Sequence, residues 1–432
     1  MLKRLQLRNF KSWREVDIEF GAITMLFGAN SSGKTALLQF LLLLKQTVEH
    51  PDPTIPLFWG DERSLVDLGG YLDAIHRHDP ARRLEWQLCW GTNKKIELST
   101  ITVSQLVYHA AVAYKGNQAI VEQVEYTFSG VQVGLRRSRE AYEVFCDGYE
   151  LKRTRGQPAK ITSPVKCYGF PEQAVARYQN ADFLARLGLE FTRLFESVYY
   201  LGPLREYPRC QYRWAGAKPR DVGFRGELAI DALIASPQMG KTVRRKGRKG
   251  SQTVQEAVAE QLRQMGLIAQ FRLHEIAPES RIYEVRLQRT PDSPEVAFTD
   301  IGFGVSQVLP VITLCYYVPE RSVLILEQPE IHLHPAVQMA LADAIIDAVK
   351  TRSIQVIIES HSEHFLLRLQ RRIAEGVLSP KDARLYFCEL QGGESRLTPL
   401  QVDRGGNIVN YPPDFFGDPL QETLERRKAA LK

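Results

Sequence analysis

The stretch Gly28-Ala29-Asn30-Ser31-Ser32-Gly33-Lys34-Thr35 decides the fold of this chain. It matches the phosphate-binding loop pattern G-x-x-x-x-G-K-[ST] at every fixed position. Residues 23–27 before it are an apolar run of strand length, and residues 35–47 after it are apolar at helical spacing. Strand, glycine-rich loop and helix in this order predict a loop whose backbone N–H groups bind phosphate. A glycine- and serine-rich turn that matches by chance is the alternative.

The loop predicts a nucleotide site with ATP and Mg²⁺ as cofactors. We expect Lys34 to reach the β and γ phosphates and Thr35 to hold Mg²⁺ through its hydroxyl. We place Lys34 on a solvent-facing loop, so its replacement by alanine should leave the fold intact. The expected nucleotide-binding residues of the loop are Gly28, Asn30, Ser31, Ser32, Gly33, Lys34 and Thr35.

Composition sets the broad class of the protein. The chain has 432 residues, enough for two or three compact units, and 56 Lys and Arg against 50 Asp and Glu give a net charge of +6. This mild excess permits nucleic-acid binding without requiring it. The six cysteines are scattered and form no C-x-x-C motif, so zinc and redox motifs are not indicated. With no signal-peptide pattern and no long apolar run, we expect a cytoplasmic protein that is not inserted in a membrane.

The pattern along the chain changes several times. Residues 2–7 and 16–20 alternate as strands, and short alternating segments from 84 to 151 predict an antiparallel β region. Residues 171–199 and 252–267 are helical in pattern, and no sustained heptad array occurs. The division we expect has an N-terminal half of an ATPase core, a mixed β and then helical insertion, a C-terminal half of the core, and a small C-terminal segment: residues 1–83, 84–290, 291–395 and 396–432.

The second half of the chain contains three further polar turns next to apolar elements. Residues 298–307 are glycine-rich and precede an apolar helix at 308–317, which is a possible anion site. Residues 323–326 are an apolar strand that ends in Glu327, and Gln328 and Glu330 follow it. Another apolar strand at 355–358 leads to Glu359, Ser360 and His361.

Together these motifs resemble the heads of ABC-class ATPases of the SMC, RecF and OLD kind, and in particular AAA family ATPases associated with prokaryotic defence. The resemblance implies an α/β P-loop NTPase fold of the ABC type, with N-terminal antiparallel strands and a compact α+β insertion. Two parts found in such families are not expected here: a coiled-coil arm, because no heptad array occurs, and a Toprim nuclease domain, because no D-x-D pair follows His361. The resemblance also implies that Glu327 ends a Walker B strand and holds Mg²⁺, and that His361 is a switch histidine that senses the γ-phosphate.

The same resemblance assigns the segment with Gly304 and Ser306 to a degenerate signature motif. In such ATPases this motif completes the nucleotide site of the opposite subunit. We therefore expect a homodimer or higher homo-oligomer with composite ATP sites. A Q-loop glutamine is not identifiable, and the final oligomeric state stays open.

One departure from the family pattern concerns the chemistry. ABC ATPases usually place a catalytic glutamate directly after the Walker B acid, and here that residue is Gln328. An amide is not a general base. We therefore predict slow ATP hydrolysis, with Glu327, Gln328, His361 and Glu330 as the candidate catalytic residues.

Two segments of the insertion leave alternatives open. Arg205, in Gly202-Pro203-Leu204-Arg205, could contact nucleotide or could be a solvated residue of a Gly-Pro turn. The basic run 241–250 could contact a nucleic-acid backbone or could be a solvated loop.

Three functions fit these observations. The first is an ATP-dependent dimerising switch that controls a separate effector protein, a nuclease or toxin, in a bacterial anti-phage defence or toxin system. The second is a DNA-binding recombination or repair ATPase. The third is a nucleotide-gated scaffold that hardly hydrolyses ATP.

Overall fold

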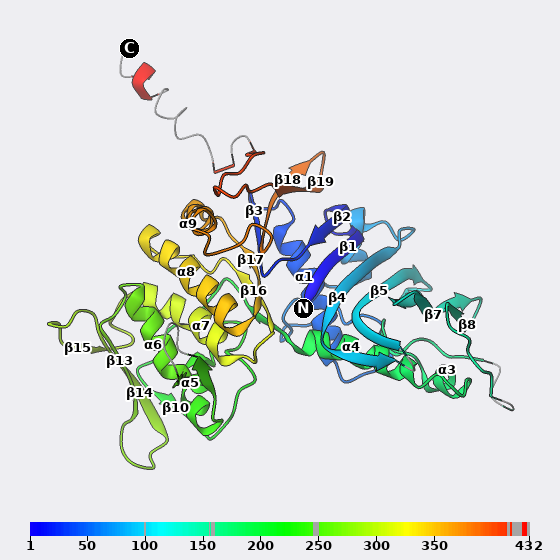
Figure 1. Ribbon diagram of the computed structural model, residues 1–432, viewed down its shortest axis with the longest axis horizontal. Helices are drawn as coiled ribbons and strands as arrows, with labels where there is room; N and C mark the ends of the chain where they lie inside the picture. Colours follow the sequence, from blue (N-terminus) through cyan, green and yellow to red (C-terminus); the bar gives the residue numbers. More distant parts are fainter. Residues whose placement is uncertain are drawn as a thin grey trace.

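The computed structural model describes residues 1–98, 101–154, 156, 160–244, 250–412, 415–416 and 426–429. Within these segments two large β-sheets are arranged with helices between them and on the far side of one sheet (Figure 1). None of the helices in the described segments combines the length and the apolar character needed to cross a membrane.

The first sheet has seven antiparallel strands in the order β2-β1-β4-β5-β6-β7-β8. The antiparallel region predicted from residue 84 is confirmed, but β4 pairs with β1. The division expected after residue 83 therefore runs through one continuous sheet. Its strands are β1 (Leu2–Phe10), β2 (Trp13–Glu19), β4 (Leu84–Leu98), β5 (Ile101–Lys115), β6 (Gln118–Phe128), β7 (Val131–Ser138) and β8 (Ala141–Asp147).

The second sheet has six strands in the order β19-β18-β3-β17-β16-β9. All of its neighbouring pairs are parallel except β18 and β19. The carboxyl ends of the parallel strands therefore meet at one edge, where α/β proteins bind their ligands. The strands are β3 (Ile23–Gly28), β9 (Val198–Leu201), β16 (Val323–Glu327), β17 (Gln355–Glu359), β18 (Ala383–Gln391) and β19 (Glu394–Leu400).

Both faces of the six-stranded sheet are buried, which explains its nearly continuous apolar strands. Leu26 of β3 packs into the core that also holds α1 (Lys34–Glu49), α4 (Phe183–Glu196) and the seven-stranded sheet. Met25 and Phe27 point the other way, toward the second core. The helices of that core are α5 (Ala229–Gln238), α6 (Val254–Gln264), α7 (Phe303–Tyr317), α8 (Pro335–Arg352) and α9 (Glu363–Ala374).

The predicted helix at 171–199 is correct for most of its length and wrong at its end. It forms α3 (Glu172–Ala176) and α4, and then the chain enters β9. The four residues of β9 are β-branched, aromatic or leucine, all buried, and β9 pairs in parallel with β16. Tertiary pairing overrides the helical pattern there.

The remaining elements are short. The predicted helix at 252–267 is α6, which begins with a capping box between Thr253 and Glu256. Residues 245–249 of the predicted basic run lie outside the described residues. The minor elements are α2 (Tyr71–Ala74), a 3₁₀ turn (His76–His78), β10 (Tyr212–Arg213), β11 (Thr242–Arg244), β12 (Ser251–Thr253), β13 (Gln270–Glu275), β14 (Ile282–Gln288) and β15 (Glu295–Ala297).

Candidate functional site

The phosphate loop joins β3 to α1, as its sequence predicts. Gly28 and Gly33 have φ values of 137° and 98°, a region that side chains disfavour. A Cβ on Gly28 would lie 2.0 Å from the carbonyl oxygen of Cys388, and one on Gly33 would lie 2.3 Å from Ser395 Oγ. Both glycines are therefore required by the backbone and by the close packing of β18 and β19.

The start of α1 is left open for an anion. Its N-cap residue, Gly33, makes no side-chain cap, whereas Ser362 caps α9 by accepting a hydrogen bond from the N–H of Phe365. Helix N–H groups without a cap carry the positive end of the helix dipole. Ser32 Oγ is buried beside them and has no hydrogen-bond partner among the residues that the structure describes. These groups fit the phosphates of a nucleotide, while Asn30 and Ser31 are exposed.

Lys34 is buried, so the expectation of a solvent-facing side chain is wrong. Its side chain is 2% exposed, and Nζ donates to the carbonyl oxygens of Gly28 at 3.1 Å and Ala29 at 2.7 Å. Burial lowers the pKa of Lys34, and the nearby charge of Glu359 opposes that shift. The loop thus folds around its own lysine, and replacing Lys34 also removes internal hydrogen bonds.

Thr35 contacts a carboxylate that our sequence analysis did not assign to the site. Thr35 Oγ1 lies 2.8 Å and 3.0 Å from the two carboxylate oxygens of Glu359, the last residue of β17. Lys34 Nζ is 3.9 Å from Glu359 Oε1. One signal for this residue was present in the sequence, because two apolar strands each end in a glutamate.

Glu327 lies beside Glu359, because the two residues are register partners of the parallel strands β16 and β17. Tyr200 Oη donates to Glu327 Oε1 at 3.1 Å. Burial and the neighbouring charge of Glu359 raise the pKa of Glu327 to about 7, and burial also raises the pKa of Glu359. The edge of the sheet therefore carries two carboxyl groups with raised pKa values, and one of them, Glu359, contacts Thr35.

Arg205 is buried against the same edge. Its three guanidinium nitrogens are inaccessible to solvent and have no hydrogen-bond partner in the described part of the chain. Burial lowers its pKa to about 10, and the neighbouring Tyr200, Glu327 and Glu330 oppose that shift. The alternative of a solvated arginine on a turn is therefore wrong, and Arg205 is a cation of this site.

Glu330 is held by one carboxylate oxygen only. Its Oε1 accepts hydrogen bonds from Ser360 Oγ and from the backbone N–H of His361, both at 2.8 Å. Its Oε2 is buried and has no partner in the described residues. Burial raises the pKa of this carboxyl. A carboxylate that is held through one oxygen and has no hydrogen-bond donor on the other is suited to accept a proton at that second oxygen.

A cleft of about 620 Å³ is lined by Glu330 and by Asn30 of the phosphate loop. Gln328 enters it with a φ of 42°, a left-handed conformation that is uncommon outside glycine. His361 lines the cleft. Partial desolvation and the charge of Lys34 lower the pKa of its imidazole. The lining residues are Asn30, Gln328, Glu330, Ile331, His332, Gln338, His361, Ser362, Glu363, His364 and Phe416.

The predicted signature residues lie elsewhere. Gly304 and Ser306 are in the first turns of α7, and neither lines the cleft. Ser306 is 4% exposed and borders a separate narrow pocket with Tyr212 and Phe298. The N-cap of α7, Gly302, is exposed and has no side-chain cap.

The site does not form a complete metal cage by itself. No group of three or more His, Cys, Asp or Glu side chains in the described residues could hold a metal ion. Mg²⁺ in nucleotide sites needs fewer protein ligands, because phosphates and water supply the rest of its shell. Thr35 with Glu327 or Glu359 fits that requirement.

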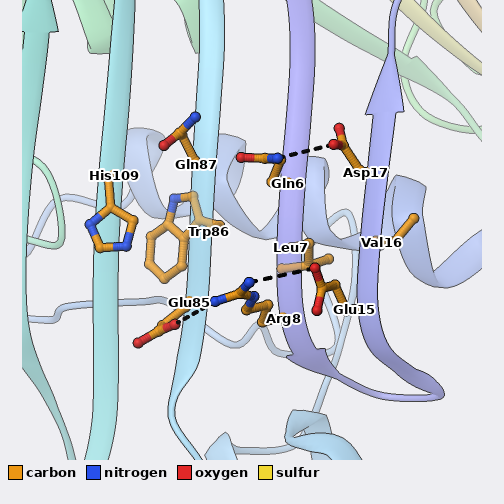
Figure 2. A pocket seen from close by; sticks show the side chains of 10 residues that line it. All are labelled: Gln6, Leu7, Arg8, Glu15, Val16, Asp17, Glu85, Trp86, Gln87 and His109. Carbon is orange, nitrogen blue, oxygen red and sulfur yellow. Dashed lines mark hydrogen bonds and ion pairs between the residues drawn. The ribbon is translucent and has the colours of Figure 1, made fainter.

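A second, smaller hollow of about 200 Å³ lies on the exposed face of the seven-stranded sheet (Figure 2). Five of its side chains, Gln6, Arg8, Glu15, Asp17 and Glu85, pair with one another across the strands. Arg8 lies 3.5 Å from Glu15 and 3.9 Å from Glu85, and Gln6 donates to Asp17 at 3.0 Å. Figure 2 shows Arg8 between Glu15 and Glu85, and Gln6 next to Asp17. This pattern is typical of a solvated sheet face.

Comparison with known proteins adds two family matches. Residues 1–108 and 238–366, together more than half of the chain, match the AAA ATPase domain family. Residues 378–425 match a family described as a protein of unknown function (DUF3696). No curated protein matches the chain.

Solved structures of SMC heads are similar in arrangement at low identity. An SMC head bound to the C-winged helix domain of ScpA has 13% identity and a TM-score of 0.48, covering 93% of this chain and 98% of that one. The SMC head domain from Thermotoga maritima has 14% identity and a TM-score of 0.42, covering 93% and 99%. At these values the likeness carries no conclusion about function.

The phosphate loop, the parallel sheet and the acidic residues at its edge agree with the first family match. The α/β fold is that of a P-loop ATPase, as the sequence predicts. The chain belongs to the AAA ATPase domain family.

Proposed function

We propose that the protein is a slowly hydrolysing, Mg²⁺-dependent ATPase that works as a nucleotide-controlled dimerising switch. The observation that carries the proposal is the position of Glu330. Glu330 lines the same cleft as Asn30 of the phosphate loop, and its Oε1 accepts hydrogen bonds from the β17–α9 turn that carries His361. In this proposal one carboxylate, that of Glu330, both takes part in the reaction and holds the turn through hydrogen bonds.

In the proposed reaction Glu330 is the general base. Water attacks the γ-phosphorus, the bond to the β–γ bridging oxygen breaks, and the proton of the water passes to the carboxylate of Glu330. Gln328 lies in the same cleft, and its amide can orient the water without accepting the proton. Bound Mg²⁺ would neutralise charge on the phosphates. Because Gln328 replaces the glutamate expected at this position, we propose turnover well below about 10 s⁻¹, a median value for enzymes.

The switch is proposed to start at His361 and continue into α9. Ser362 caps α9, and the side chain of Gln370 on this helix donates to the carbonyl of Gly406 at 2.8 Å. A change in the hydrogen bonds of Glu330 would thus move the start of a helix that contacts the C-terminal region. We propose that this movement controls a separate effector, a nuclease or toxin of an anti-phage defence or toxin system.

The dimer is proposed to form through the open N-terminus of α7. Its uncapped N–H groups are a second anion site, which in the proposed dimer meets the nucleotide of the other copy. Ser306 is a poor probe of this surface, because it is buried and a bulky replacement would disturb the core. Gly304 is a better probe, since a Cβ there would meet its nearest atoms at 3.9 Å, an ordinary contact distance.

The test compares Gly304→Glu with Gly304→Ala in a Glu330→Gln background that retains ATP. Both replacements favour the helix over glycine, but only glutamate adds a negative charge, which would repel a partner's phosphates. We expect light scattering to show an ATP-dependent dimer for Gly304→Ala and a monomer for Gly304→Glu, with equal ATP affinity. A Gly304→Glu dimer as stable as the Gly304→Ala dimer would refute the proposed surface.

A further inference from the structure

Glu359 is hydrogen-bonded to the atom of the phosphate loop that is expected to bind metal, Thr35 Oγ1. Both of its carboxylate oxygens lie within 3.0 Å of Thr35 Oγ1, the hydroxyl that the loop offers to Mg²⁺. No hydrogen bond joins Glu327 to Thr35 among the described residues, and Tyr200 donates to Glu327 instead. A metal bound to Thr35 therefore meets Glu359 before it meets Glu327.

The order of strands explains this difference. β17 lies between β3 and β16, and neighbouring strands are about 4.8 Å apart. Glu359 therefore ends one strand spacing from the strand that carries the phosphate loop, and Glu327 ends two spacings away. A side chain at the end of β17 can reach a metal on Thr35 directly, whereas one at the end of β16 would reach it more easily through water.

We propose that Glu359 is a direct ligand of the nucleotide-bound Mg²⁺, so that the metal site has two carboxylates, Glu359 and Glu327. This inference rests on the proposed nucleotide site and adds a ligand to it. Carboxylate oxygens are the ligands that Mg²⁺ prefers, and one or two of them are usual beside nucleotide phosphates. Glu359 and the hydroxyl of Thr35, which are now hydrogen-bonded to each other, would both be ligands of the bound cation.

A different role for Glu359 predicts the opposite behaviour. Lys34 Nζ lies 3.9 Å from Glu359 Oε1, so the carboxylate could act as an internal substitute for a phosphate that ATP must displace. Removing its charge would then strengthen nucleotide binding whether or not a metal is present. If Glu359 is a metal ligand, removing its charge weakens binding only when the metal is present.

The experiment measures the affinity for a non-hydrolysable ATP analogue by calorimetry, in EDTA and in Mg²⁺. The proteins are the parent, Glu359→Gln, Glu327→Gln and the control Glu389→Gln, a strand glutamate that accepts its hydrogen bond from Gln391. Glutamine keeps an oxygen that can accept from Thr35, which protects the fold. We expect Glu359→Gln to lose roughly ten- to a hundredfold in affinity in Mg²⁺ and nothing in EDTA.

A second measurement follows the metal itself. Mn²⁺ replaces Mg²⁺, and its electron paramagnetic resonance is recorded with the analogue bound to the parent and to Glu359→Gln. A weaker Mn²⁺ complex in the variant supports direct ligation. Equal Mn²⁺ binding, or tighter analogue binding in both EDTA and Mg²⁺, overturns the inference. If the parent binds no analogue at all, the proposed nucleotide site itself is wrong.

Discussion

The phosphate-loop half of the site and the β16 half differ in how their charges are matched. In the first half, Lys34 has two carbonyl partners and a nearby carboxylate, and Thr35 donates to Glu359. In the second half, the guanidinium of Arg205 and one oxygen of Glu330 are buried without hydrogen-bond partners in the described segments. The side chains of Lys34 and Thr35 in the loop are thus paired within the chain. In the β16 half, by contrast, a guanidinium and a carboxylate oxygen are buried without hydrogen-bond partners among the described residues.

This contrast indicates a division of work. A buried charge without a partner costs several kcal/mol, so a structure that retains one usually uses it for a ligand or for chemistry. We infer that the phosphate loop provides affinity for nucleotide through Lys34 and the uncapped N–H groups of α1, which its fold already holds in place. The β16 half provides groups that become fully satisfied only during binding or reaction. The four predictions below test that division, from the largest expected effect to the smallest.

Replacing Lys34 by alanine should remove nucleotide binding, with a loss of roughly 10² to 10⁴-fold, because charge-assisted hydrogen bonds to phosphate disappear. It should also cost about 1–2 kcal/mol of unfolding free energy, since the carbonyls of Gly28 and Ala29 lose their donor. Calorimetry and urea unfolding measure the two effects. The control is Lys45→Ala, a buried lysine of the same helix that pairs with Glu49. Wild-type affinity in Lys34→Ala would refute the loop assignment.

Replacing Glu330 by glutamine should lower kcat by about 10² to 10⁴-fold, because the proton acceptor is lost while the acceptor for Ser360 and His361 is kept. Nucleotide affinity should change little. Gln328→Ala should lower kcat less, since an amide only orients water, and Gln328→Glu should raise it. Steady-state phosphate release decides between them, with Glu172→Gln as control, since Glu172 is exposed at the start of α3 and lies outside the cleft lining. A larger loss in Gln328→Ala than in Glu330→Gln would contradict the division of roles.

Stability without ligands should fall as pH rises, through Glu327. Its folded pKa of about 7 lies above its ordinary value of 4.5, so between these two values the folded state keeps a proton that the unfolded chain has released. The favourable contribution is therefore complete below about pH 4.5 and is lost as pH rises to about 7. Urea unfolding in EDTA at pH 5 and pH 8 should show a loss of up to about 3 kcal/mol from this group, reduced in Glu327→Gln. The same slope in both proteins would mean that Glu327 ionises normally.

Replacing Arg205 by methionine should stabilise the ligand-free protein by about 1–3 kcal/mol, because a buried charge without a hydrogen-bond partner is removed and the side-chain volume is nearly kept. Turnover should fall at the same time. The control is Arg209→Met, since Arg209 is exposed and paired with Glu206 and should change stability by less than about 1 kcal/mol. A destabilised Arg205→Met with unchanged turnover would assign Arg205 a structural role.

Much of the fold could be predicted because its strongest signals are local. The apolar run before Glu327 ends where β16 ends, and the Gly-rich loop requires the strand and helix on either side of it. The helical pattern up to Tyr199 misled the prediction only where β9 gains a parallel partner from a distant part of the chain. Local pattern thus predicts an element well until a distant pairing competes with it.

The site could be predicted less completely, because its key contacts join distant segments. Glu359 meets Thr35 only because β17 lies next to β3, and no spacing in the sequence encodes that order of strands. The burial of Lys34 and Arg205 likewise depends on segments that are far away in the chain. Residue types predicted which groups could act, and the topology decided which of them meet.

The C-terminal region has a mechanical consequence for the ATPase. β18 forms a parallel ladder with β3 that reaches Gly28, so the two family matches divide a single sheet. Cutting the chain before β18 would uncover the edge of the strand that carries the phosphate loop, and such edges promote aggregation. In the intact protein, a partner that pulls on this region would act on the nucleotide site through one row of hydrogen bonds. A force or displacement at residues 378–425 would therefore be transmitted directly to the strand that ends in the phosphate loop.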